Sequence, residues 1–362
     1  MTNKIRILQV VSIMNVGGIE TMLMNYLRNI DRNLFEVDFL VHREDEGFFD
    51  KEIKTLGAQI YKAPSINPFK KGEYKSFMKE FFNNHHYDIV HSHLDALSYF
   101  PLMCAKNANI DVRVAHSHVN GFDKDAKYLL RRYYTTKIPK VATDYAACSE
   151  SAGKFMFPNA ENVKVILNPL DIEKFKYSEQ SSHDLKQEFS IPENSKVVGH
   201  VGRFNKAKNH PFIVELAKLN PELIFVCVGE GDDKPVIEKL CLDQEVDNIV
   251  FTGVRSDVYR FYSLFDIFIL PSFYEGLGNV AIEAQCAGIP TIVSEHVSSD
   301  VDLTNLVDRF PLNLDMWSSA IQKHISDSKE LMIPQSLMKY DIKPALENLE
   351  SFYCKLVGGK DK

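Results

Sequence analysis

Short apolar runs alternate with amphipathic stretches along most of the chain. In the first half, buried strands are predicted at 5–13, 35–41, 59–62, 87–93, 113–119 and 144–149. In the second half, they are predicted at 196–201, 223–228, 249–255 and 266–272. Several of the segments between them have a helical period, residues 73–83 among them. Strands that alternate with helices are typical of a doubly wound parallel sheet, so the predicted fold class is α/β.

The length of the chain predicts two domains. At 362 residues, it exceeds the size at which a single hydrophobic core keeps growing. Residues 163–171 end the first half, and the polar stretch 177–184 is expected to connect it to the second. We therefore predict a first domain at 1–170 and a second at 171–335. In an enzyme hinged at this link, the ligand site would lie in a cleft between the two sheets.

The strand at 266–272 leads into the stretch with the most chemical content. Gly276 and Gly278 follow it and allow the backbone to approach a ligand closely. A helix is expected from about Asn279. Free amide groups near its start, from Leu277 to Val280, could bind an anion such as a phosphate.

Two carboxylates flank this strand-to-helix junction. Glu275 lies in the loop, and Glu283 lies on the second turn of the helix. Either one alone could be a helix-start acid or a surface acid. Together they are compatible with many chemistries, an acid/base pair included.

Two other loops carry candidate phosphate ligands. Arg203 and Lys208 follow the strand at 196–201 and precede a helix, where two cations suit a leaving group on which negative charge builds up. Either cation alone would be an ordinary surface charge. Gly17 and Gly18 lie between the first strand and the first helix. A strand, a glycine-rich loop and a helix start together form a ready anion-binding site. Two glycines could also mark only a tight turn.

Several of these motifs resemble one known family. The run from Phe273 to Pro290 resembles the paired-glutamate signature of the family-four retaining nucleotide-sugar glycosyltransferases, whose GT-B architecture has two Rossmann-like domains facing a cleft. Residues 17–22, Gly-Gly-Ile-Glu-Thr-Met, resemble the first loop of these enzymes, especially in the exopolysaccharide and capsule branch. The resemblance extends from Gly17 to Ser294, with four motifs in the expected order. It implies an acceptor-side first domain, a nucleotide-sugar-binding second domain, and a helix at about 336–357 that packs back on the first.

The resemblance also implies a role for each candidate residue. Glu275 would contact hydroxyl groups of the donor sugar, and Glu283 would hydrogen-bond the nucleotide ribose. Arg203 and Lys208 match the spacing of the diphosphate clamp of the family, and the glycine pair 17–18 would lie against the same diphosphate. Further donor contacts are implied for these residues: Gly229, Gly253, Val254, Gly276, Leu277, Gly278 and Asn279.

Two His-Ser-His triplets, at 91–93 and 116–118, end two of the predicted strands. An extended His-x-His directs both imidazoles to one side, so the two triplets could in principle bind zinc. No cysteine or carboxylate cluster accompanies them, and no metal is expected. His91 and His93 could be ordinary loop histidines. The resemblance implies that His118 is the active-site histidine near the donor sugar and the acceptor, although the doubled triplet also allows His116.

Composition and charge narrow the possible partners and the compartment. A net charge of −7 and a pI near 6.0 argue against wholesale nucleic-acid binding. The six cysteines include no C-x-x-C pair and are expected to be buried thiols in a reducing compartment. No apolar run is long enough to span a bilayer, and residues 7–14 are followed by no signal-peptide cleavage site. A cytoplasmic location is therefore expected.

Residues 124–140 combine basic and aromatic side chains with a single acid, Asp125. This composition fits a solvated helix face over a local core. It also fits an interfacial helix that docks on anionic lipid. Lipid-linked acceptors are common in the family that the chain resembles, so peripheral contact with the inner face of the cell membrane is a second interpretation.

The sequence thus predicts a retaining, metal-independent hexosyltransferase without a cofactor. It would move a sugar from a UDP- or GDP-sugar to a carbohydrate or lipid-linked acceptor, in exopolysaccharide, capsule or other cell-surface glycan synthesis. Alternatives are a nucleotide-sugar epimerase of the same architecture, which needs no acceptor, and a non-catalytic nucleotide-sugar-binding partner of another transferase. A dinucleotide-dependent dehydrogenase is disfavoured because neither Gly17-Gly18 nor Gly229-Glu230-Gly231 forms a G-x-G-x-x-G fingerprint.

Overall fold

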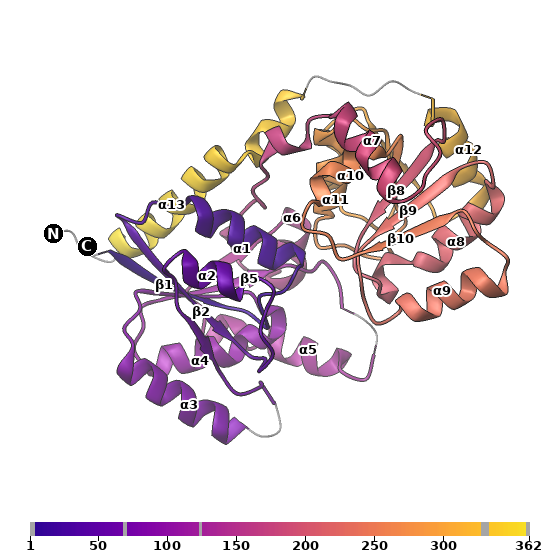
Figure 1. Ribbon diagram of the computed structural model, residues 1–362. Coiled ribbons are helices and arrows are strands. Elements are labelled where there is room, and N and C mark those ends of the chain that lie inside the picture. Colours follow the sequence, from indigo (N-terminus) through magenta and orange to yellow (C-terminus); the bar gives the residue numbers. More distant parts are fainter. Residues whose placement is uncertain (1–3, 68–70, 123–124, 327–332, 360–362) are drawn as a thin grey trace. The chain divides into compact units, whose positions relative to one another are not determined.

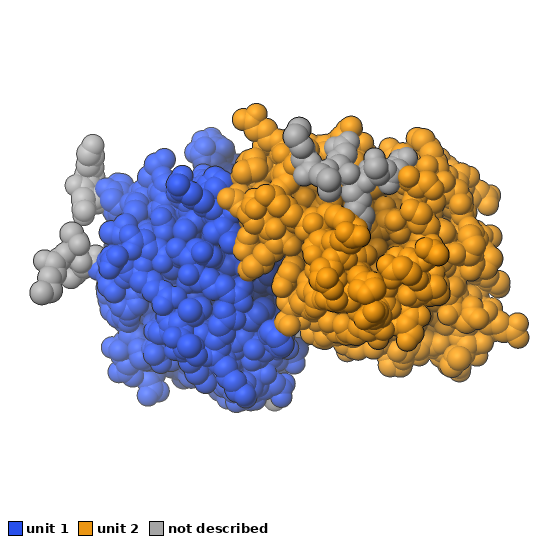
Figure 2. All heavy atoms as spheres, turned by 45° about the horizontal axis from the view of Figure 1, so that its top comes forward, with its two compact units in different colours: residues 1–169, 342–362 blue, residues 170–341 orange. Residues whose placement is uncertain are grey.

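The computed structural model describes residues 4–67, 71–122, 125–326 and 333–359 (Figure 1). The chain forms two compact units, residues 1–169 with 342–362 and residues 170–341, which Figure 2 colours separately. The chain first changes unit between residues 169 and 170, beside the expected boundary at 170/171. It returns to the first unit at residue 342 rather than 336, because a short 3-10 helix, Gln335–Tyr340, stays with the second unit. There, the Leu170 N–H donates to the Tyr340 carbonyl at 2.7 Å.

The first unit contains a seven-stranded sheet in the order β3-β2-β1-β4-β5-β6-β7, in which every pairing is parallel. Its strands are β1 (Ile5–Val10), β2 (Phe35–Val41), β3 (Ile60–Lys62), β4 (Ile89–Ser92), β5 (Val112–Ser117), β6 (Asp144–Ala147) and β7 (Val163–Val165). Along β2, Phe39 and Val41 enter one hydrophobic core while Leu40 enters another. Because strand side chains alternate between faces, the sheet is buried on both sides.

Helices cover both faces of this first sheet. They are α1 (Gly18–Asn29), α2 (Asp50–Thr55), α3 (Lys71–Asn84), α4 (Tyr99–Asn107), α5 (Tyr128–Thr135), α6 (Glu150–Met156) and α13 (Ile342–Gly358), with 3-10 helices η1 (Asp95–Ser98) and η2 (Ile138–Lys140). Helices α1, α2 and α13 supply one core, and α3 and α4 supply the other. The last helix, α13, lies beside α1 and buries Ala345, Leu349 and Tyr353 in the first core (Figure 1).

The second unit contains a six-stranded parallel sheet in the order β10-β9-β8-β11-β12-β13. Its strands are β8 (Val197–Val201), β9 (Ile224–Val228), β10 (Ile249–Gly253), β11 (Ile267–Leu270), β12 (Thr291–Ser294) and β13 (Val307–Phe310). Its helices are α7 (Glu179–Glu188), α8 (His210–Leu219), α9 (Lys234–Asp243), α10 (Val258–Leu264), α11 (Asn279–Cys286) and α12 (Leu314–His324), with 3-10 helices η3 (Ile172–Phe175), η4 (Lys206–Lys208), η5 (Ser299–Val301) and η6 (Gln335–Tyr340). Helices α8, α9 and α12 share one core, in which Trp317 is fully buried.

One sequence expectation is wrong: the polar stretch 177–184 does not connect the two units but lies within the second. It enters helix α7, which packs against α10. The Ser178 side chain caps the helix by accepting a hydrogen bond from the Ser181 N–H at 3.2 Å. Leu185 is the buried residue that anchors the helix. A single anchor gives too weak a periodic signal to predict a helix from the sequence.

The strand order places a switch point in each sheet. In the first sheet, β1 lies between β2 and β4, and in the second, β8 lies between β9 and β11. Ligands of open α/β sheets bind beyond the carboxyl ends of the strands at such points. The predicted α/β class is confirmed, and the candidate loops after β1, β4, β8 and β11 all follow strands at the switch points.

Candidate active site

In the second unit, backbone hydrogen bonds tie together the loops that follow β8, β9 and β11. The Gly202 N–H donates to the Val228 carbonyl at 3.0 Å, and the Phe204 N–H donates to the Glu230 carbonyl at 2.9 Å. On the other side, the Phe273 N–H donates to the Ala207 carbonyl at 2.8 Å. The segment that carries Arg203 and Lys208 is therefore held from both neighbouring loops.

Two of the predicted donor-binding glycines have backbone reasons to be glycine. Gly229 has a φ of +142°, and a Cβ there would clash with the Gly202 carbonyl oxygen. Gly253 has a φ of +74°, and its carbonyl accepts from the Gly229 N–H at 3.0 Å. Both glycines therefore let the loops after β8, β9 and β10 approach one another. The side chain of the next residue, Val254, is half exposed.

The structure brings Lys208 and Glu275 into direct contact. The Lys208 Nζ donates to the Glu275 Oε1 at 2.7 Å, and both side chains are largely buried. The Ser272 hydroxyl donates to the same oxygen at 2.6 Å. The second carboxylate oxygen of Glu275 has no hydrogen bond to any residue that the structure describes. A residue predicted to bind diphosphate and one predicted to bind the sugar thus form a single pair.

Arg203 differs from Lys208 in having no partner in the described part of the chain. Its side chain is exposed, and its guanidinium forms no ion pair or hydrogen bond with the described residues. An unpaired guanidinium presents a planar set of donors that matches the oxygens of a phosphate.

Glu283 lies on α11, which begins after Gly278, a residue with a φ of +93°. The Tyr262 hydroxyl donates to the Glu283 Oε2 at 2.7 Å. Burial raises the pKa of Glu283, while the Tyr262 hydrogen bond and the nearby Lys208 charge lower it.

The other residues predicted for this loop lie around the start of α11. Leu277 is buried in the protein, so its side chain is structural. The Oδ1 of Asn279 is buried and has no partner among the described residues. Gly276 is partly exposed between Glu275 and Leu277. The backbone, rather than these side chains, is what this loop could offer to a ligand.

In the first unit, Gly17 and Gly18 lie where predicted, at the start of α1. Gly17 precedes the helix and Gly18 is its first residue. The Glu20 carboxylate folds back against Gly17, where a Cβ would clash with it. The diphosphate contact predicted for these glycines remains a prediction.

The two His-Ser-His triplets meet in the first unit because β4 and β5 are adjacent, with His91 paired to Val114 and Ser92 to Ala115. The exposed fractions of His91, His93 and His116 are 1%, 3% and 1%. His91 and His93 are therefore not ordinary loop histidines, since strand pairing draws both into the interior. His118 is only partly buried.

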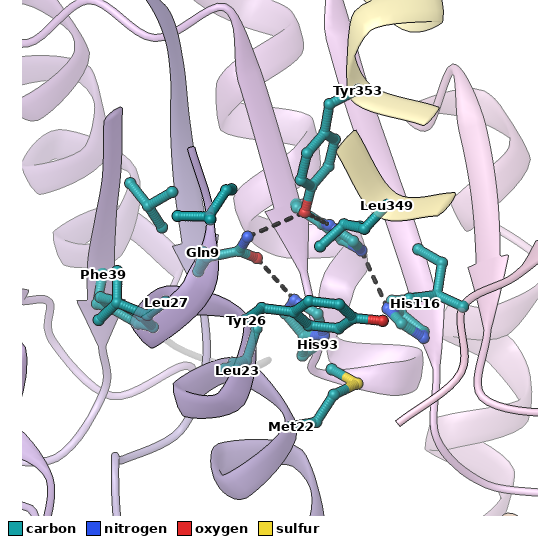
Figure 3. A pocket seen from close by; sticks show the side chains of 14 residues that line it. Gln9, Met22, Leu23, Tyr26, Leu27, Phe39, His93, His116, Leu349 and Tyr353 are labelled. Atoms are coloured by element: carbon teal, nitrogen blue, oxygen red, sulfur yellow. Dashed lines mark hydrogen bonds between the residues drawn. The ribbon is translucent and has the colours of Figure 1, made fainter. Parts of the chain in front are cut away.

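These histidines belong to a hydrogen-bonded network. His91 contacts the Tyr353 hydroxyl through Nδ1 at 2.8 Å and the His116 Nδ1 through Nε2 at 3.0 Å. His93 contacts the Gln9 Oε1 through Nε2 at 2.8 Å and the His118 Nε2 through Nδ1 at 2.9 Å. Figure 3 shows Gln9 joined to both Tyr353 and His93.

Burial favours the neutral form of all four histidine side chains in this network. Desolvation lowers the pKa of His118 and that of His91 to about 3, and it lowers the pKa values of His93 and His116 well below the ordinary range. The backbone N–H of His118 donates to the Asp95 Oδ1 at 2.8 Å. Burial raises the pKa of Asp95 to about 7.

Three of the histidines could be considered as metal ligands. One ring nitrogen from each of His91, His93 and His116 lies within 4.8 Å of the others. A cavity of about 20 Å³ adjoins all three and is also lined by Tyr26 and Tyr353 (Figure 3). Of the six ring nitrogens, only the His116 Nε2 lacks a hydrogen-bond partner among the described residues.

Sequence reasoning missed several residues of these two clusters: Gln9, Asp95, Tyr262, Ser272 and Tyr353. Ser272 comes two residues after the end of β11, so its position just beyond a buried strand could have identified it. Gln9 could have been noticed as a polar residue within the apolar run of β1. Nothing in the local pattern around Tyr262 or Tyr353 distinguishes them from core tyrosines.

Comparison with known proteins connects both units to one family. Residues 16–174 match the model described as Glycosyltransferase Family 4, and residues 181–310 match Glycosyl transferases group 1. EpsF of Bacillus subtilis (strain 168), which is named as a glycosyltransferase, is 34% identical over 339 residues, 88% of this chain and 87% of EpsF. This chain belongs to glycosyltransferase family 4.

Two further relatives of this glycosyltransferase have more specific names. The UDP-Gal:alpha-D-GlcNAc-diphosphoundecaprenol alpha-1,3-galactosyltransferase of Escherichia coli is 26% identical over 76% of this chain and 77% of its own. The capsular polysaccharide biosynthesis glycosyltransferase CapH of Staphylococcus aureus is 24% identical over 96% of this chain and 98% of its own.

The fold of this glycosyltransferase is also that of solved structures. Anabaena HepE, crystallised with UDP and glucose, superposes with a TM-score of 0.81 at 18% identity, over 96% of this chain and 99% of HepE. The architecture is GT-B, as the motifs implied. In the described part of the chain, every helix is too short or too polar to cross a membrane.

Proposed function

We propose that this glycosyltransferase moves a hexose from a UDP-sugar to a carbohydrate or polyprenyl-linked acceptor, in the synthesis of an exopolysaccharide, capsule or other cell-surface glycan. GDP-sugars are the second donor class. The name of the Escherichia coli relative, which includes UDP-Gal and a diphosphoundecaprenol acceptor, supports a UDP donor and a lipid-linked acceptor. The capsular relative supports the biosynthetic setting.

The contact between Lys208 and Glu275 is the observation that carries this proposal. An ammonium group has three N–H donors, and Lys208 uses one of them on Glu275. The other two can bind oxygens of a diphosphate while the first still holds the sugar-binding carboxylate. One side chain can therefore place the leaving group and the sugar relative to each other.

Lys208 and Arg203 can also stabilise the cleavage of the bond between the sugar and the diphosphate. As the bond between the sugar carbon and the diphosphate oxygen breaks, its electron pair stays with the nucleoside diphosphate. Arg203, which is exposed and has no partner in the described part of the chain, can bind these oxygens in a bidentate manner with Lys208 beside it. Two side-chain cations can supply the charge that a divalent metal supplies elsewhere, so we propose a metal-independent reaction.

The two glutamates hold the donor at its two ends. The unpaired oxygen of Glu275 is available to hydroxyl groups of the sugar. Glu283 keeps one oxygen on Tyr262 and can accept ribose hydroxyl groups at the other. In this proposal, both carboxylates bind the donor and neither acts as the general acid or base.

His118 is the active-site histidine of the proposal. It keeps solvent-accessible surface, whereas His116 is sealed in the interior. Because burial keeps the pKa of His118 low, the ring is neutral at physiological pH. A neutral ring can hydrogen-bond the sugar or accept the proton of the attacking hydroxyl group.

A thermal-shift panel tests the donor class. Ligands that bind the folded protein raise its Tm by mass action. UDP-sugars should raise the Tm in the presence of EDTA, and GDP-sugars should do so less. Equal shifts with every nucleotide, or none with any, would contradict the proposal.

Product analysis tests the reaction. Transfer should require an acceptor and give a product with the anomeric configuration of the donor by NMR. A changed sugar nucleotide released without acceptor would instead identify an epimerase. Activity lost in EDTA and restored by Mg²⁺ or Mn²⁺ would contradict metal independence.

The predicted membrane contact maps to α5. Leu129 and Tyr133 are exposed by 78% and 54%, and Arg132 is exposed beside them. Arg131 pairs with Asp125 at 2.8 Å, and Lys124 lies outside the described residues. We propose that this surface binds anionic lipid on the cytoplasmic face of the membrane.

Vesicle co-sedimentation tests this surface. Wild type should bind vesicles that contain anionic lipid, more weakly as salt increases, and Arg132→Glu should bind less. Lys154→Glu, at an exposed position on α6, is the matched control and should bind like wild type. Absence of wild-type binding at low salt would exclude the contact.

A further inference from the structure

Two chains of hydrogen bonds begin at the side-chain amide of Gln9, inside the first unit (Figure 3). One chain passes through His93 to His118. The other passes through Tyr353 and His91 to His116. A neutral imidazole has one donor and one acceptor nitrogen. A group at one end that can only accept therefore determines every tautomer along a chain of imidazoles.

The first chain fixes His118. The Oε1 of Gln9 can only accept, so the His93 Nε2 must carry a proton and donate it at 2.8 Å. The lone pair of a neutral His93 is then on Nδ1, where it accepts from the His118 Nε2–H at 2.9 Å. The Nδ1 of His118 is left with its lone pair and no partner among the described residues. Burial lowers the pKa values of both rings, which keeps them neutral.

The second chain contains a hydroxyl group. The Gln9 Nε2 donates to the Tyr353 hydroxyl oxygen at 3.0 Å, and Tyr353 contacts the His91 Nδ1 at 2.8 Å. Because a hydroxyl group can both donate and accept, this chain leaves the tautomers of His91 and His116 open. The first chain alone fixes its histidines, His93 and His118, with the proton on Nε2.

The hydrogen bonds also argue against a metal among His91, His93 and His116. A metal ligand needs a free lone pair. Five of the six ring nitrogens already form hydrogen bonds with described residues, and the lone pair of His93 accepts from His118. The cluster is a hydrogen-bond network rather than a zinc site.

We propose that Gln9 is a positioning residue that, through His93, fixes His118 as its Nε2–H tautomer. The Nδ1 of His118 is then the ring nitrogen that accepts a hydrogen bond or a proton from the substrate. This inference rests on the proposed function, in which His118 serves the transfer reaction. Gln9 acts on His118 through an intervening ring and need not contact any substrate.

The tautomers can be measured directly by long-range ¹H–¹⁵N correlation spectra of the protein labelled with ¹⁵N-histidine. His118 signals are assigned by their loss in His118→Gln. In wild type, His118 should show one protonated Nε2 and an unprotonated Nδ1 between pH 6 and 8. Protonation at Nδ1, or an average of the two tautomers, would overturn the proposal whether or not a Gln9 variant folds.

Two variants separate positioning from packing. Gln9→Leu removes the acceptor for His93, so His118 should show averaged tautomers, and kcat should fall about tenfold at an unchanged Kd for nucleotide. Tyr353→Phe removes the acceptor of the Gln9 Nε2 but leaves the bond between the Gln9 Oε1 and His93, so the His118 tautomer and kcat should stay as in wild type. If Tyr353→Phe lowers kcat as much as Gln9→Leu, the network is merely structural and the positioning role is wrong.

The measurements distinguish a failure of the positioning role of Gln9 from a failure of the proposed function. A wild-type protein that shows the expected tautomers but transfers no sugar contradicts the proposed function alone. A wild-type protein that transfers sugar while His118 samples both tautomers contradicts the positioning role alone.

Discussion

At the scale of single residues, Glu283 shows how a neighbour controls the charge of a ligand-binding group. Burial raises the pKa of its carboxyl, and the hydrogen bond from Tyr262 opposes this effect. Accepting two ribose hydroxyl groups requires the ionised form, because a protonated carboxyl loses an acceptor. Nucleotide affinity should therefore fall as the pH decreases toward the pKa of Glu283.

Tyr262→Phe should move this loss of affinity to higher pH. The substitution removes a hydrogen bond that stabilises the ionised carboxyl, so the pKa of Glu283 rises further. Calorimetric titration of UDP between pH 5 and 8 measures the effect, with the variant approaching wild type at the upper end. Tyr259→Phe, on the surface of the same helix, is the control. An unchanged pH profile in Tyr262→Phe would remove Glu283 from the nucleotide site.

The sequence could predict single residues where they belong to a motif, and not where they depend on distant contacts. Lys208 and Glu275 each follow a predicted strand, yet their contact joins residues 67 positions apart. The bond between Gln9 and Tyr353 joins residues 344 positions apart and depends on the return of the chain to the first unit. No local pattern contains that information.

At the scale of elements, glycines determine how closely the loops of the second sheet can approach. Gly229 holds the loop after β9 against the loop after β8, where the Gly202 carbonyl fills the space a Cβ would need. The neighbour of Gly202 is Arg203. The position of a candidate diphosphate ligand thus depends on a glycine in another loop.

Gly229→Ala should lower both stability and nucleotide affinity. The clash and the φ of +142° should together cost at least about 3 kcal/mol and displace the loop of Arg203. Gly57→Ala is the matched control: its φ is +86° with open space around it, so it should cost about 1–2 kcal/mol and leave nucleotide affinity unchanged. Urea unfolding and calorimetry measure the two effects. A Gly229→Ala protein as stable as Gly57→Ala would contradict the packing argument.

Strands were easier to predict than the polar helix. The predicted run at 35–41 coincides with β2, the run at 87–93 contains β4, and the run at 113–119 overlaps all of β5 but its first residue, because buried parallel strands are continuous apolar runs. Helix α7 was missed because its surface is polar and its anchor is the single buried Leu185. Its stability comes from the Ser178 cap and from packing on α10, and the packing is a tertiary effect.

At the scale of the whole molecule, the chain is a GT-B glycosyltransferase with twelve histidines. Burial lowers the pKa of seven of them: His42, His91, His93, His116, His118, His200 and His210. Burial raises the pKa of two acids, Asp95 and Glu283. These two sets affect the pH dependence of folding in opposite directions.

The seven histidines should outweigh the two acids in the pH dependence of folding. The free energy of unfolding should therefore decrease as the pH falls below about 6.5. The unfolded chain binds protons at its histidines in this range, and the folded chain does not. Each such group contributes up to about 1.4 kcal/mol per pH unit, whereas the two acids bind protons in the folded state and oppose the loss. The urea midpoint should be clearly lower at pH 5.5 than at pH 7.5.

His116→Gln provides the control for this pH dependence. The side-chain amide can donate to or accept from the His91 Nε2, and one titrating group is removed. Its stability should therefore decrease less between pH 7.5 and 5.5 than that of wild type. A wild-type midpoint that stays constant or increases toward pH 5.5 would contradict the buried neutral state of the cluster.

The central claim is that Arg203 and Lys208 bind the donor diphosphate without a metal. Calorimetric titration of UDP in EDTA into wild type, Arg203→Ala and Lys206→Ala tests it most directly. Lys206 is an exposed cation in the same loop, and its loss should leave the Kd unchanged. Loss of a charge-assisted hydrogen bond should weaken binding by Arg203→Ala about tenfold to a hundredfold. If UDP does not bind wild type in EDTA, or if both variants bind it equally well, the account is wrong.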